Sequence, residues 1–258
     1  MRTRSREPVY SAAVAVGVTI FRLFKLRPSV TGLVNLPDAG GAVLAITHFG
    51  YADFALVEWL TWRKSRRHIR FMAKKGAFDK PIVGALLRGM RHISVDMTAG
   101  AQAYGEAVRA LSAGELVGVF PEGGVSASFT VRDLKSGAAR MAQEARVPIV
   151  PIAVWGGHRL LTKNHKPSLR EAYRTPISFV VGAPIHVDRD DDPQQVTDRL
   201  HETLQGLVDQ AQANYPEPGA GTWWQPAHLG GTAPTPVEAA ATEAERQRRK
   251  AAARAAAS

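Results

Sequence analysis

Cysteine is absent from this chain of 258 residues, and its absence removes several kinds of chemistry. Disulfide bonds, zinc sites built on thiolates and cysteine nucleophiles are all excluded. A Gly-x-Ser-x-Gly nucleophile elbow is missing as well. Ser126 and Ser128 follow a pair of glycines, but without the elbow a serine hydrolase is a weak interpretation.

Acidic residues are scarce relative to basic ones. Lys and Arg number 33 against 23 Asp and Glu, which gives a net charge of +10. This charge favours an anionic partner, which is nucleic acid, an anionic membrane surface or a phosphorylated substrate. Residues 63–75 hold seven Lys or Arg and no acid, so they form either a solvated helix face or a patch for lipid or carrier phosphates. No nucleic-acid recognition motif accompanies them, and we expect no nucleic-acid partner.

The apolar run near the N-terminus is short. Val9–Phe21 falls below the roughly 20 residues that cross a bilayer. Three arginines precede it, and Arg22, Lys25 and Arg27 follow it. Basic groups at both ends suit a helix lying in the membrane interface, although a first helix packed on the domain is the alternative. We predict that residues 1–30 attach the protein, as a peripheral or monotopic protein, to the cytoplasmic face of the plasma membrane.

Apolar runs alternate with amphipathic segments between residues 40 and 215. Short runs that are apolar throughout and separated by helices are typical of a parallel sheet that is covered on both faces. We therefore predict an α/β fold with a largely parallel sheet covered by helices on both faces. The predicted strands are Ala42–Thr47, Ile69–Ala73, His92–Val95, Leu116–Phe120, Ile149–Trp155 and Ile177–Val181. The predicted helices are Asp53–Arg63, Pro81–Arg88, Ala101–Ala113, Ser136–Ala145 and Pro193–Asn214.

The composition changes after Tyr215. We predict that residues 31–215 form one domain and that residues 216–258 form a Pro- and Gly-rich arm with an Ala- and Arg-rich tail. The tail has high helix propensity but almost no apolar face, so it is an exposed helix or a disordered segment. Trp223 and Trp224 either fold back onto the domain or rest at a membrane interface.

Unusual polar residues stand where two predicted strands end. His48 and Asp53 follow the first strand, and Glu122, Gly123 and Gly124 follow a later one. Sites in open parallel sheets form beyond the carboxyl ends of the strands, so these residues are candidates for one site. If a helix begins between them, the Asp53 carboxylate can accept a hydrogen bond from His48 and make it a general base. In the alternative, Asp53 only caps the helix.

Four blocks in order resemble the motifs of the glycerolipid acyltransferase family, which includes the bacterial lysophosphatidic acid acyltransferases. The first is His-x4-Asp, here in THFGYAD. The others are GMRHISVDM at residues 89–97, FPEGGVS at residues 120–126 and VPIVP at residues 147–151. The resemblance implies acyl transfer from acyl-CoA or acyl carrier protein to a hydroxyl of a lipid or glycerol phosphate. It implies no metal and no cofactor beyond that thioester co-substrate.

By this resemblance His48 is the general base, Asp53 orients it, and Glu122 and Gly123 help to bind the acceptor. The sequence departs from the family at Met97 and Val125, where the family has arginines that are thought to grip the acceptor phosphate.

A phosphate then needs other groups. Gly124 replaces a family threonine, and the amides of the glycine pair can approach a phosphate or an oxyanion closely. Lys135 lies in LKSG, which resembles the family segment after the third block. The candidate cations are Lys74, Lys75, Arg88, Arg91, Arg132 and Lys135.

We expect an acyltransferase that converts 1-acylglycerol 3-phosphate to phosphatidic acid in phospholipid biosynthesis. The two missing arginines leave glycerol 3-phosphate, a lysophospholipid with a head group and a glycolipid open as acceptors. A non-catalytic binder of anionic membranes or nucleic acid is the alternative of another class. An acyl chain needs an apolar surface, so we expect a groove from the His48–Asp53 pair towards the N-terminal helix.

Overall fold

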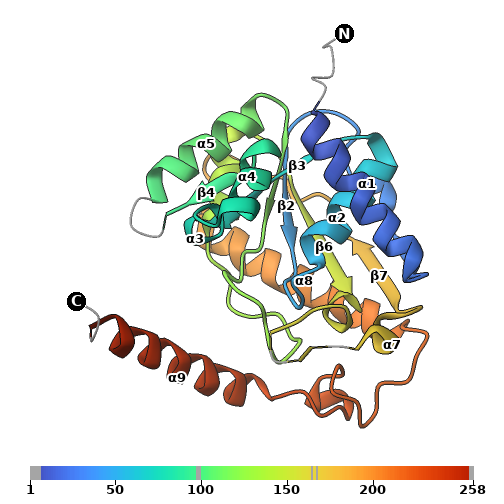
Figure 1. Cartoon of the computed structure of the whole chain (residues 1–258). Coiled ribbons are helices and arrows are strands. Elements are labelled where there is room, and N and C mark those ends of the chain that lie inside the picture. The colour runs from blue at the N-terminus through green and yellow to red at the C-terminus, as the bar shows by residue number, and fades with distance from the viewer. Residues whose placement is uncertain (1–6, 97–99, 164, 167, 256–258) are drawn as a thin grey trace.

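The computed structural model describes residues 7–96, 100–163, 165–166 and 168–255. Within these residues the strands form one seven-stranded sheet in the order β1-β7-β6-β2-β5-β3-β4 (Figure 1). The strands are β1 (Arg27–Thr31), β2 (Ala42–Ile46), β3 (Ile69–Lys74), β4 (Ile93–Val95), β5 (Leu116–Val119), β6 (Ile149–Trp155) and β7 (Pro176–Val181). The helices are α1 (Pro8–Leu23), α2 (Asp53–Ser65), α3 (Lys75–Phe78), α4 (Pro81–Gly89), α5 (Gly100–Ser112), α6 (Gly137–Ala145), α7 (Leu169–Ala172), α8 (Pro193–Ala213) and α9 (Pro236–Ala255).

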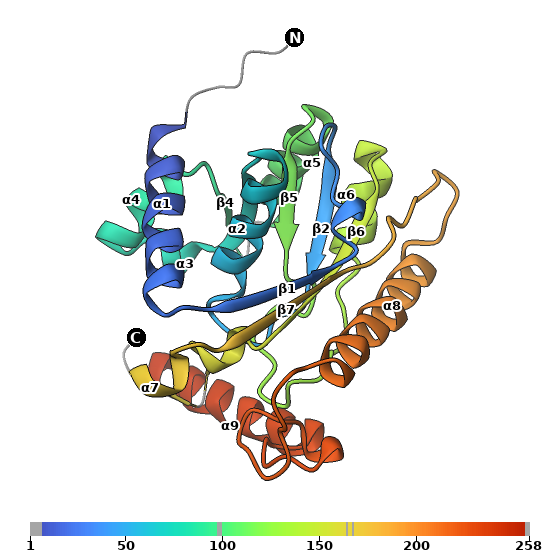
Figure 2. The same ribbon diagram turned by 90° about the vertical axis from the view of Figure 1, so that its right-hand side faces the viewer.

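Neighbouring strands pair in parallel except β6 and β7, so β1 and β7 run opposite to the other five. One face of the sheet packs against α5, α6 and α8. The other face packs against α2, with Phe21 of α1 at its margin. Figure 2 shows α1 and α2 on one side of the sheet and α8 on the other. The predicted α/β fold, a largely parallel sheet covered on both faces, is confirmed.

The central strand β2 fixes the position of the site. It lies between β5 and β6, and all five of its residues are buried. Val43 and Ala45 pack on the side of α5, α6 and α8, whereas Leu44 and Ile46 pack on the side of α2. Because both faces of this strand are covered, its sequence is apolar throughout instead of alternating. Its carboxyl end is therefore a rigid platform for the residues that follow.

Strand β1 differs from the sequence-based expectation, and the C-terminal segment decides between two alternatives that the sequence left open. Strand β1 was not predicted, because all five of its residues are exposed and carry no apolar pattern. It is an edge strand, where the missing N–H of Pro28 costs no ladder hydrogen bond. The Ala- and Arg-rich tail is helical as α9, and Trp224 is buried against the domain. The arm thus folds back onto the domain.

Helix α1 packs along α2 and α4 through one face. Tyr10 and Val14 are buried there, and the Tyr10 hydroxyl lies 2.9 Å from Glu58 Oε2 of α2 and donates to the Ile69 carbonyl at 2.7 Å. The opposite face exposes Val16, Ile20 and Leu23. Among the described residues, no helix is both long and apolar enough to cross a membrane.

Three of the seven basic residues in the segment at 63–75 are partly or fully buried and bind other parts of the protein. Lys64 pairs with Asp38 at 2.7 Å, and Arg67 donates to three backbone carbonyls. Arg70 is buried between Glu7 and Glu115. These contacts tie α2 and β3 to neighbouring loops, whereas Arg63, Arg66, Lys74 and Lys75 remain exposed.

Candidate active site

His48 lies two residues beyond the carboxyl end of β2, and its ring is held from two sides. Its Nδ1 lies 3.3 Å from Asp53 Oδ2. One face of the ring stacks on Phe120 with 4.0 Å between the centroids. Among the described residues Nε2 has no hydrogen-bond partner, and the side chain remains 15% exposed. The nitrogen remote from the carboxylate is therefore open to a ligand.

Asp53 is the first residue of α2 and is fully buried. Its Oδ2 also accepts hydrogen bonds from the amides of Phe49 at 2.9 Å and Gly50 at 2.8 Å. Burial raises the pKa of Asp53, while the contacts with His48 and the two amides lower it. At the start of a helix the carboxylate also meets the positive end of the helix dipole. Asp53 thus both closes the turn and faces the histidine.

This arrangement selects one tautomer of His48. With Nδ1–H donating to the carboxylate, the proton is absent from Nε2, which becomes the basic nitrogen. When Nε2 takes a proton, the buried negative charge of Asp53 stabilises the imidazolium. The pair can therefore remove a proton from a hydroxyl that approaches Nε2.

Glu122 connects the loop after β5 to the loop after β2. Its Oε1 accepts the amide of His48 at 2.9 Å, and its Oε2 accepts the amide of Arg132 at 3.3 Å. Burial raises the pKa of Glu122 to about 8, although both amides and the charge of Arg132 act in the opposite direction. The Ser126 amide adds a further tie by donating to the His48 carbonyl at 2.8 Å. The loop after β5 is thus fixed to the loop that carries His48.

The comparisons with known proteins agree with this geometry. A family model described as Acyltransferase matches residues 27–155 of the 258. The 1-acyl-sn-glycerol-3-phosphate acyltransferase of Bacillus subtilis is 31% identical over 160 residues, which cover 59% of this chain and 70% of that protein. The chain belongs to the acyltransferase family. The resemblance drawn from the four sequence blocks is confirmed, and the protein is an acyltransferase.

Two further proteins are similar to this acyltransferase, one in sequence and one in fold. An uncharacterised protein of Mycobacterium leprae is 32% identical over 145 residues, but the chain spans only 38% of that protein's length. The crystal structure of the 1-acyl-sn-glycerophosphate (LPA) acyltransferase PlsC from Thermotoga maritima superposes with a TM-score of 0.67 at 22% identity. That superposition covers 84% of this chain and 86% of the other, so the two share the fold.

The acyltransferase brings only some of its predicted site residues together. His48, Glu122, Gly123 and Gly124 lie in the loops beyond the carboxyl ends of β2 and β5, and Asp53 begins α2 beside His48. The carboxyl oxygens of Glu122 bind backbone amides, so its predicted contact with the acceptor stays a prediction. Among the described residues no group of His, Asp or Glu could hold a metal ion.

The predicted cations are scattered. Lys74 ends β3 and is exposed, whereas Lys75 pairs with Asp96 at 2.9 Å. Arg88 donates to the Phe78 carbonyl at 2.9 Å. Arg91 pairs with Glu7 and Glu115. Arg91 comes shortly before β4 and Glu115 immediately precedes β5, so the pair lies at the amino ends of these strands, whereas His48 lies at the carboxyl ends. Lys135 lies over the Gly123 turn. Met97 falls outside the described residues, and Val125 is buried.

A third loop supports the site, and the sequence did not point to it. Residues 156–162 follow β6, and the Cβ of any side chain at Gly157 would lie 2.5 Å from Asp53 Oδ1. Thr162 donates to the Phe49 carbonyl at 2.7 Å, and Tyr51 donates its amide to the Leu161 carbonyl at 2.8 Å. The signal that could have found this loop is the pair Gly156-Gly157 at a strand end, which repeats the pattern of the glycines after β5.

His158 links this loop to the C-terminal arm. Its ring is fully buried and packs beside Phe129 and Trp155, and Nε2 donates to the Trp224 carbonyl at 3.0 Å. Burial lowers the pKa of His158 to about 3, so the ring is neutral at physiological pH. The C-terminal arm thus supports residues 156–162, the loop that contacts Asp53.

Proposed function

We propose that this acyltransferase moves a fatty acyl group from acyl-CoA or acyl carrier protein to the free hydroxyl of 1-acylglycerol 3-phosphate, giving phosphatidic acid for phospholipid synthesis. The observation that carries the proposal is the His48–Asp53 pair, with Nδ1 held by the carboxylate and Nε2 open. The name of the Bacillus subtilis relative supports the choice of acceptor.

In the proposed reaction the acceptor hydroxyl approaches His48 Nε2. As Nε2 takes the hydroxyl proton, the oxygen attacks the thioester carbonyl and the new C–O bond forms. The tetrahedral intermediate then collapses, the C–S bond breaks, and the proton on Nε2 passes to the leaving thiolate. Asp53 stays ionised and stabilises the imidazolium between the two steps. No acyl-enzyme forms in this scheme, which agrees with Asp53 being the only side chain among the described residues that is hydrogen-bonded to the His48 ring.

A second candidate changes only the acceptor. Val125 is buried and uncharged where the family pattern has an arginine, which favours a lysophospholipid with a head group, glycerol 3-phosphate or a glycolipid. The net charge of +10 motivated a non-catalytic binder, but the match to the acyltransferase family and the intact His48–Asp53 pair favour an enzyme.

A competition assay decides between the acceptors. Purified protein receives oleoyl-CoA or oleoyl-acyl carrier protein and an equimolar mixture of 1-palmitoylglycerol 3-phosphate, glycerol 3-phosphate, lysophosphatidylglycerol and monooleoylglycerol. Because one charged phosphate contact is worth about 1.5–3 kcal/mol, mass spectrometry should find phosphatidic acid in roughly tenfold excess or more over diacylglycerol. Phosphatidic acid should also exceed the products of the other two acceptors. A predominance of 1-oleoylglycerol 3-phosphate, phosphatidylglycerol or diacylglycerol among the products would overturn the acceptor assignment.

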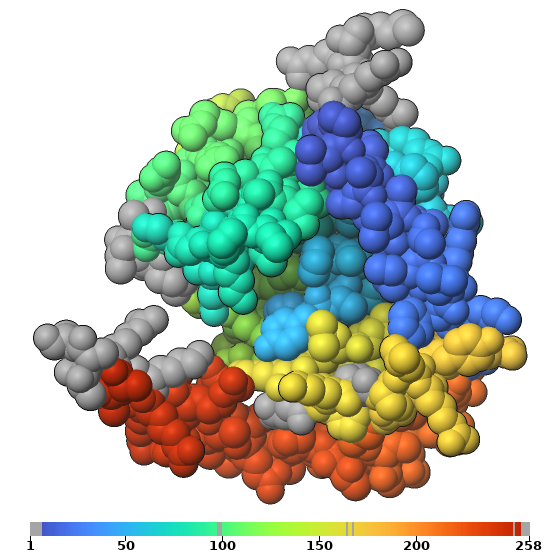
Figure 3. Space-filling view, in the orientation of Figure 1, coloured from blue at the N-terminus to red at the C-terminus, as the bar shows by residue number. Residues whose placement is uncertain are grey.

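The access route for a lipid is proposed to lie beside α1 and α4. Exposed apolar side chains gather on these two helices: Val16, Ile20 and Leu23 on α1, and Ile82, Val83 and Leu86 on α4. Figure 3 shows both helices on the face of the molecule that is hollowed between α4 and α9. A surface of this kind, next to basic residues such as Arg22, suits contact with the interface of an anionic membrane. This supports the proposal of a peripheral membrane protein, and its location on the cytoplasmic face of the plasma membrane stays a prediction.

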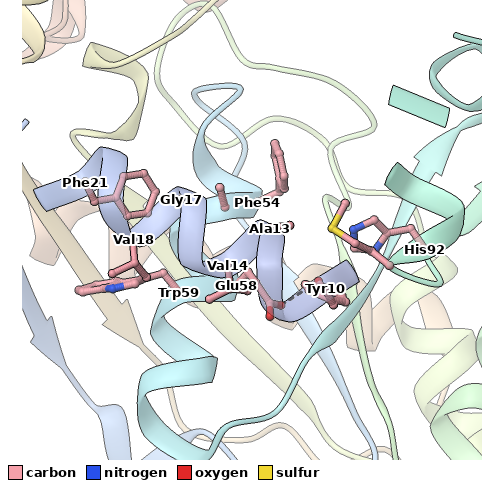
Figure 4. A pocket seen from close by; sticks show the side chains of 12 residues that line it. Tyr10, Ala13, Val14, Gly17, Val18, Phe21, Phe54, Glu58, Trp59 and His92 are labelled. Atoms are coloured by element: carbon pink, nitrogen blue, oxygen red, sulfur yellow. Dashed lines mark hydrogen bonds between the residues drawn. The ribbon is translucent and has the colours of Figure 1, made fainter. Parts of the chain in front are cut away.

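An apolar pocket lies beneath α1, and neither His48 nor Asp53 is among its lining residues. It has a volume of about 60 Å³ and lies between α1 and α2, with Phe54, the residue after Asp53, in its lining. Figure 4 shows Phe21 and Trp59 at one end and Tyr10 and His92 at the other. The groove expected from the sequence, from the His48–Asp53 pair towards the N-terminal helix, stays a prediction. We propose that this pocket beneath α1 receives part of the acyl chain.

Membrane attachment through α1 can be measured with vesicles. Leu23 is 71% exposed, and burying it in the interface contributes about 1 kcal/mol or more, so Leu23→Ser should weaken cosedimentation with phosphatidylcholine–phosphatidylglycerol vesicles about fivefold. Val34→Ser is the matched control, because Val34 is 84% exposed in the turn after β1, which runs away from α1 (Figure 2). Equal binding of wild type, Leu23→Ser and Val34→Ser would contradict the attachment proposal.

A further inference from the structure

Two cations lie over the glycine turn that follows β5. The Cβ of a side chain at Gly124 would lie 3.7 Å from Arg132 Nη1, and one at Gly123 would lie 3.4 Å from Lys135 Nζ. Both basic side chains are exposed, and neither forms a hydrogen bond or an ion pair with the residues that the structure describes. Because the glycines carry no side chains, the guanidinium and the ammonium reach the surface of the turn itself.

The positions of these cations are coupled to the catalytic base. Glu122 binds the amides of both His48 and Arg132, and the Lys135 amide donates to the Pro121 carbonyl at 3.0 Å. The Ser126 amide donates to the His48 carbonyl. Residues 121–135 therefore form one hydrogen-bonded unit with the loop of His48.

We propose that Arg132, assisted by Lys135, binds the phosphate of the acceptor and thereby sets the preference for a phosphomonoester; this rests on the proposed function. In 1-acylglycerol 3-phosphate two carbons and one ester oxygen separate the reactive hydroxyl oxygen from phosphorus. A phosphate on the Gly123–Gly124 turn thus leaves the hydroxyl within reach of a base on the adjoining loop. A guanidinium can bind two phosphate oxygens at once, and an ammonium adds charge.

The local sequence is consistent with a relocated arginine. Val125, at the position of a family arginine, is 6% exposed and contributes no charge to the turn. Gly124, at the position of the family threonine, leaves open the space next to the Arg132 guanidinium. A threonine there would extend beyond a Cβ that already lies 3.7 Å from Nη1. The changes at residues 124 and 125 therefore fit a phosphate contact that comes from residue 132.

The other candidate cations are less well placed. Lys75 and Arg91 are paired with carboxylates, and Arg91 lies at the far edge of the sheet. Arg88 is bound to a backbone carbonyl. Lys74 is exposed at the end of β3, with no described contact to the turn. Arg132 and Lys135 combine an exposed side chain, no side-chain hydrogen bond or ion pair with the described residues, and attachment to the loop of His48.

The test compares Arg132→Gln with Arg109→Gln, which removes an equal charge from the exposed surface of α5. For Arg132→Gln we expect KM for 1-oleoylglycerol 3-phosphate to rise roughly 10- to 50-fold, as for the loss of one charged hydrogen-bonding group. KM for monooleoylglycerol and for oleoyl-CoA should stay unchanged, and Arg132→Lys should recover part of the loss. Lys135→Gln should raise the same KM by a smaller factor, and Arg109→Gln should match wild type.

An unchanged KM for 1-oleoylglycerol 3-phosphate in an otherwise active Arg132→Gln protein would overturn the inference while leaving the proposed function intact. A rise in KM for oleoyl-CoA instead would also overturn it, because it would assign Arg132 to the donor. Calorimetric titration with glycerol 3-phosphate gives a readout without turnover. Wild type should bind it and Arg132→Gln should bind it about tenfold more weakly, whereas equal affinities would overturn the inference even if no acceptor were acylated.

Discussion

Replacing His48 with alanine should lower kcat at least about 10³-fold in the acceptor assay, because no described group takes over the role of Nε2 as base. Folding should be little affected, since the His48 side chain is partly exposed at the surface of the loop. Far-UV circular dichroism and urea unfolding would check that the variant is folded. A His48→Ala protein that keeps more than a tenth of the wild-type kcat would contradict the mechanism.

Asp53→Asn separates the charge of the carboxylate from its structural role. The asparagine carbonyl can still accept the amides of Phe49 and Gly50, so the turn should survive. The negative charge that stabilises the imidazolium is lost, and kcat should again fall about 10³-fold. Asp53→Ala is less informative, because it also leaves buried amides unpaired at a cost of about 1–3 kcal/mol each.

The matched control for this variant is Asp192→Asn. Asp192 caps α8 by accepting the Gln194 amide at 3.0 Å, so it too is a carboxylate at a helix start, but it lies away from the dyad. Its substitution should leave kcat unchanged. If Asp53→Asn behaved like Asp192→Asn, Asp53 would be a helix cap and His48 would act without it.

The contact between His48 and Asp53 was predictable because it is local. Five residues separate the two, and one helix start brings them together. The edge on which a cation lies was also predictable from the order of elements. Arg91 precedes β4 and so lies at the amino ends of the parallel strands. Arg132 and Lys135 follow β5 and lie at the carboxyl ends. A short sequence distance between a cation and a motif does not show at which end of the strands the cation lies.

The support of the site by the loop after β6 was not predictable in this way. Gly157 meets Asp53 because β6 pairs with β2, so the ends of two strands that are distant in the chain become neighbours. The local sequence does not specify which strand pairs with β2. Likewise, β1 was missed because an exposed edge strand has no apolar alternation to detect. In both cases the missing information is long-range pairing, which residue patterns encode weakly.

Gly157→Ala should lower kcat about 10²-fold without a change in any group that touches substrate. The added methyl group would lie 2.5 Å from Asp53 Oδ1 and 3.0 Å from Leu56 Cδ1, so the carboxylate or the loop has to move. Because the backbone at Gly157 is outside the left-handed region, the effect is steric alone. Displacing a catalytic group by about 1 Å can cost this much rate, and overpacking should destabilise the fold by about 1–3 kcal/mol.

Gly206→Ala on α8 provides the matched control. Its methyl group would meet no atom within 4 Å, so kcat should stay at the wild-type value and stability should rise by about 0.5–1 kcal/mol through better helix propensity. Urea unfolding and steady-state kinetics on both variants separate packing from positioning. A Gly157→Ala protein that is destabilised but retains the wild-type kcat would show that Asp53 keeps its position without this loop. A fall in kcat with KM unchanged would show that the Asp53 carboxylate can face His48 only because residue 157 has no side chain.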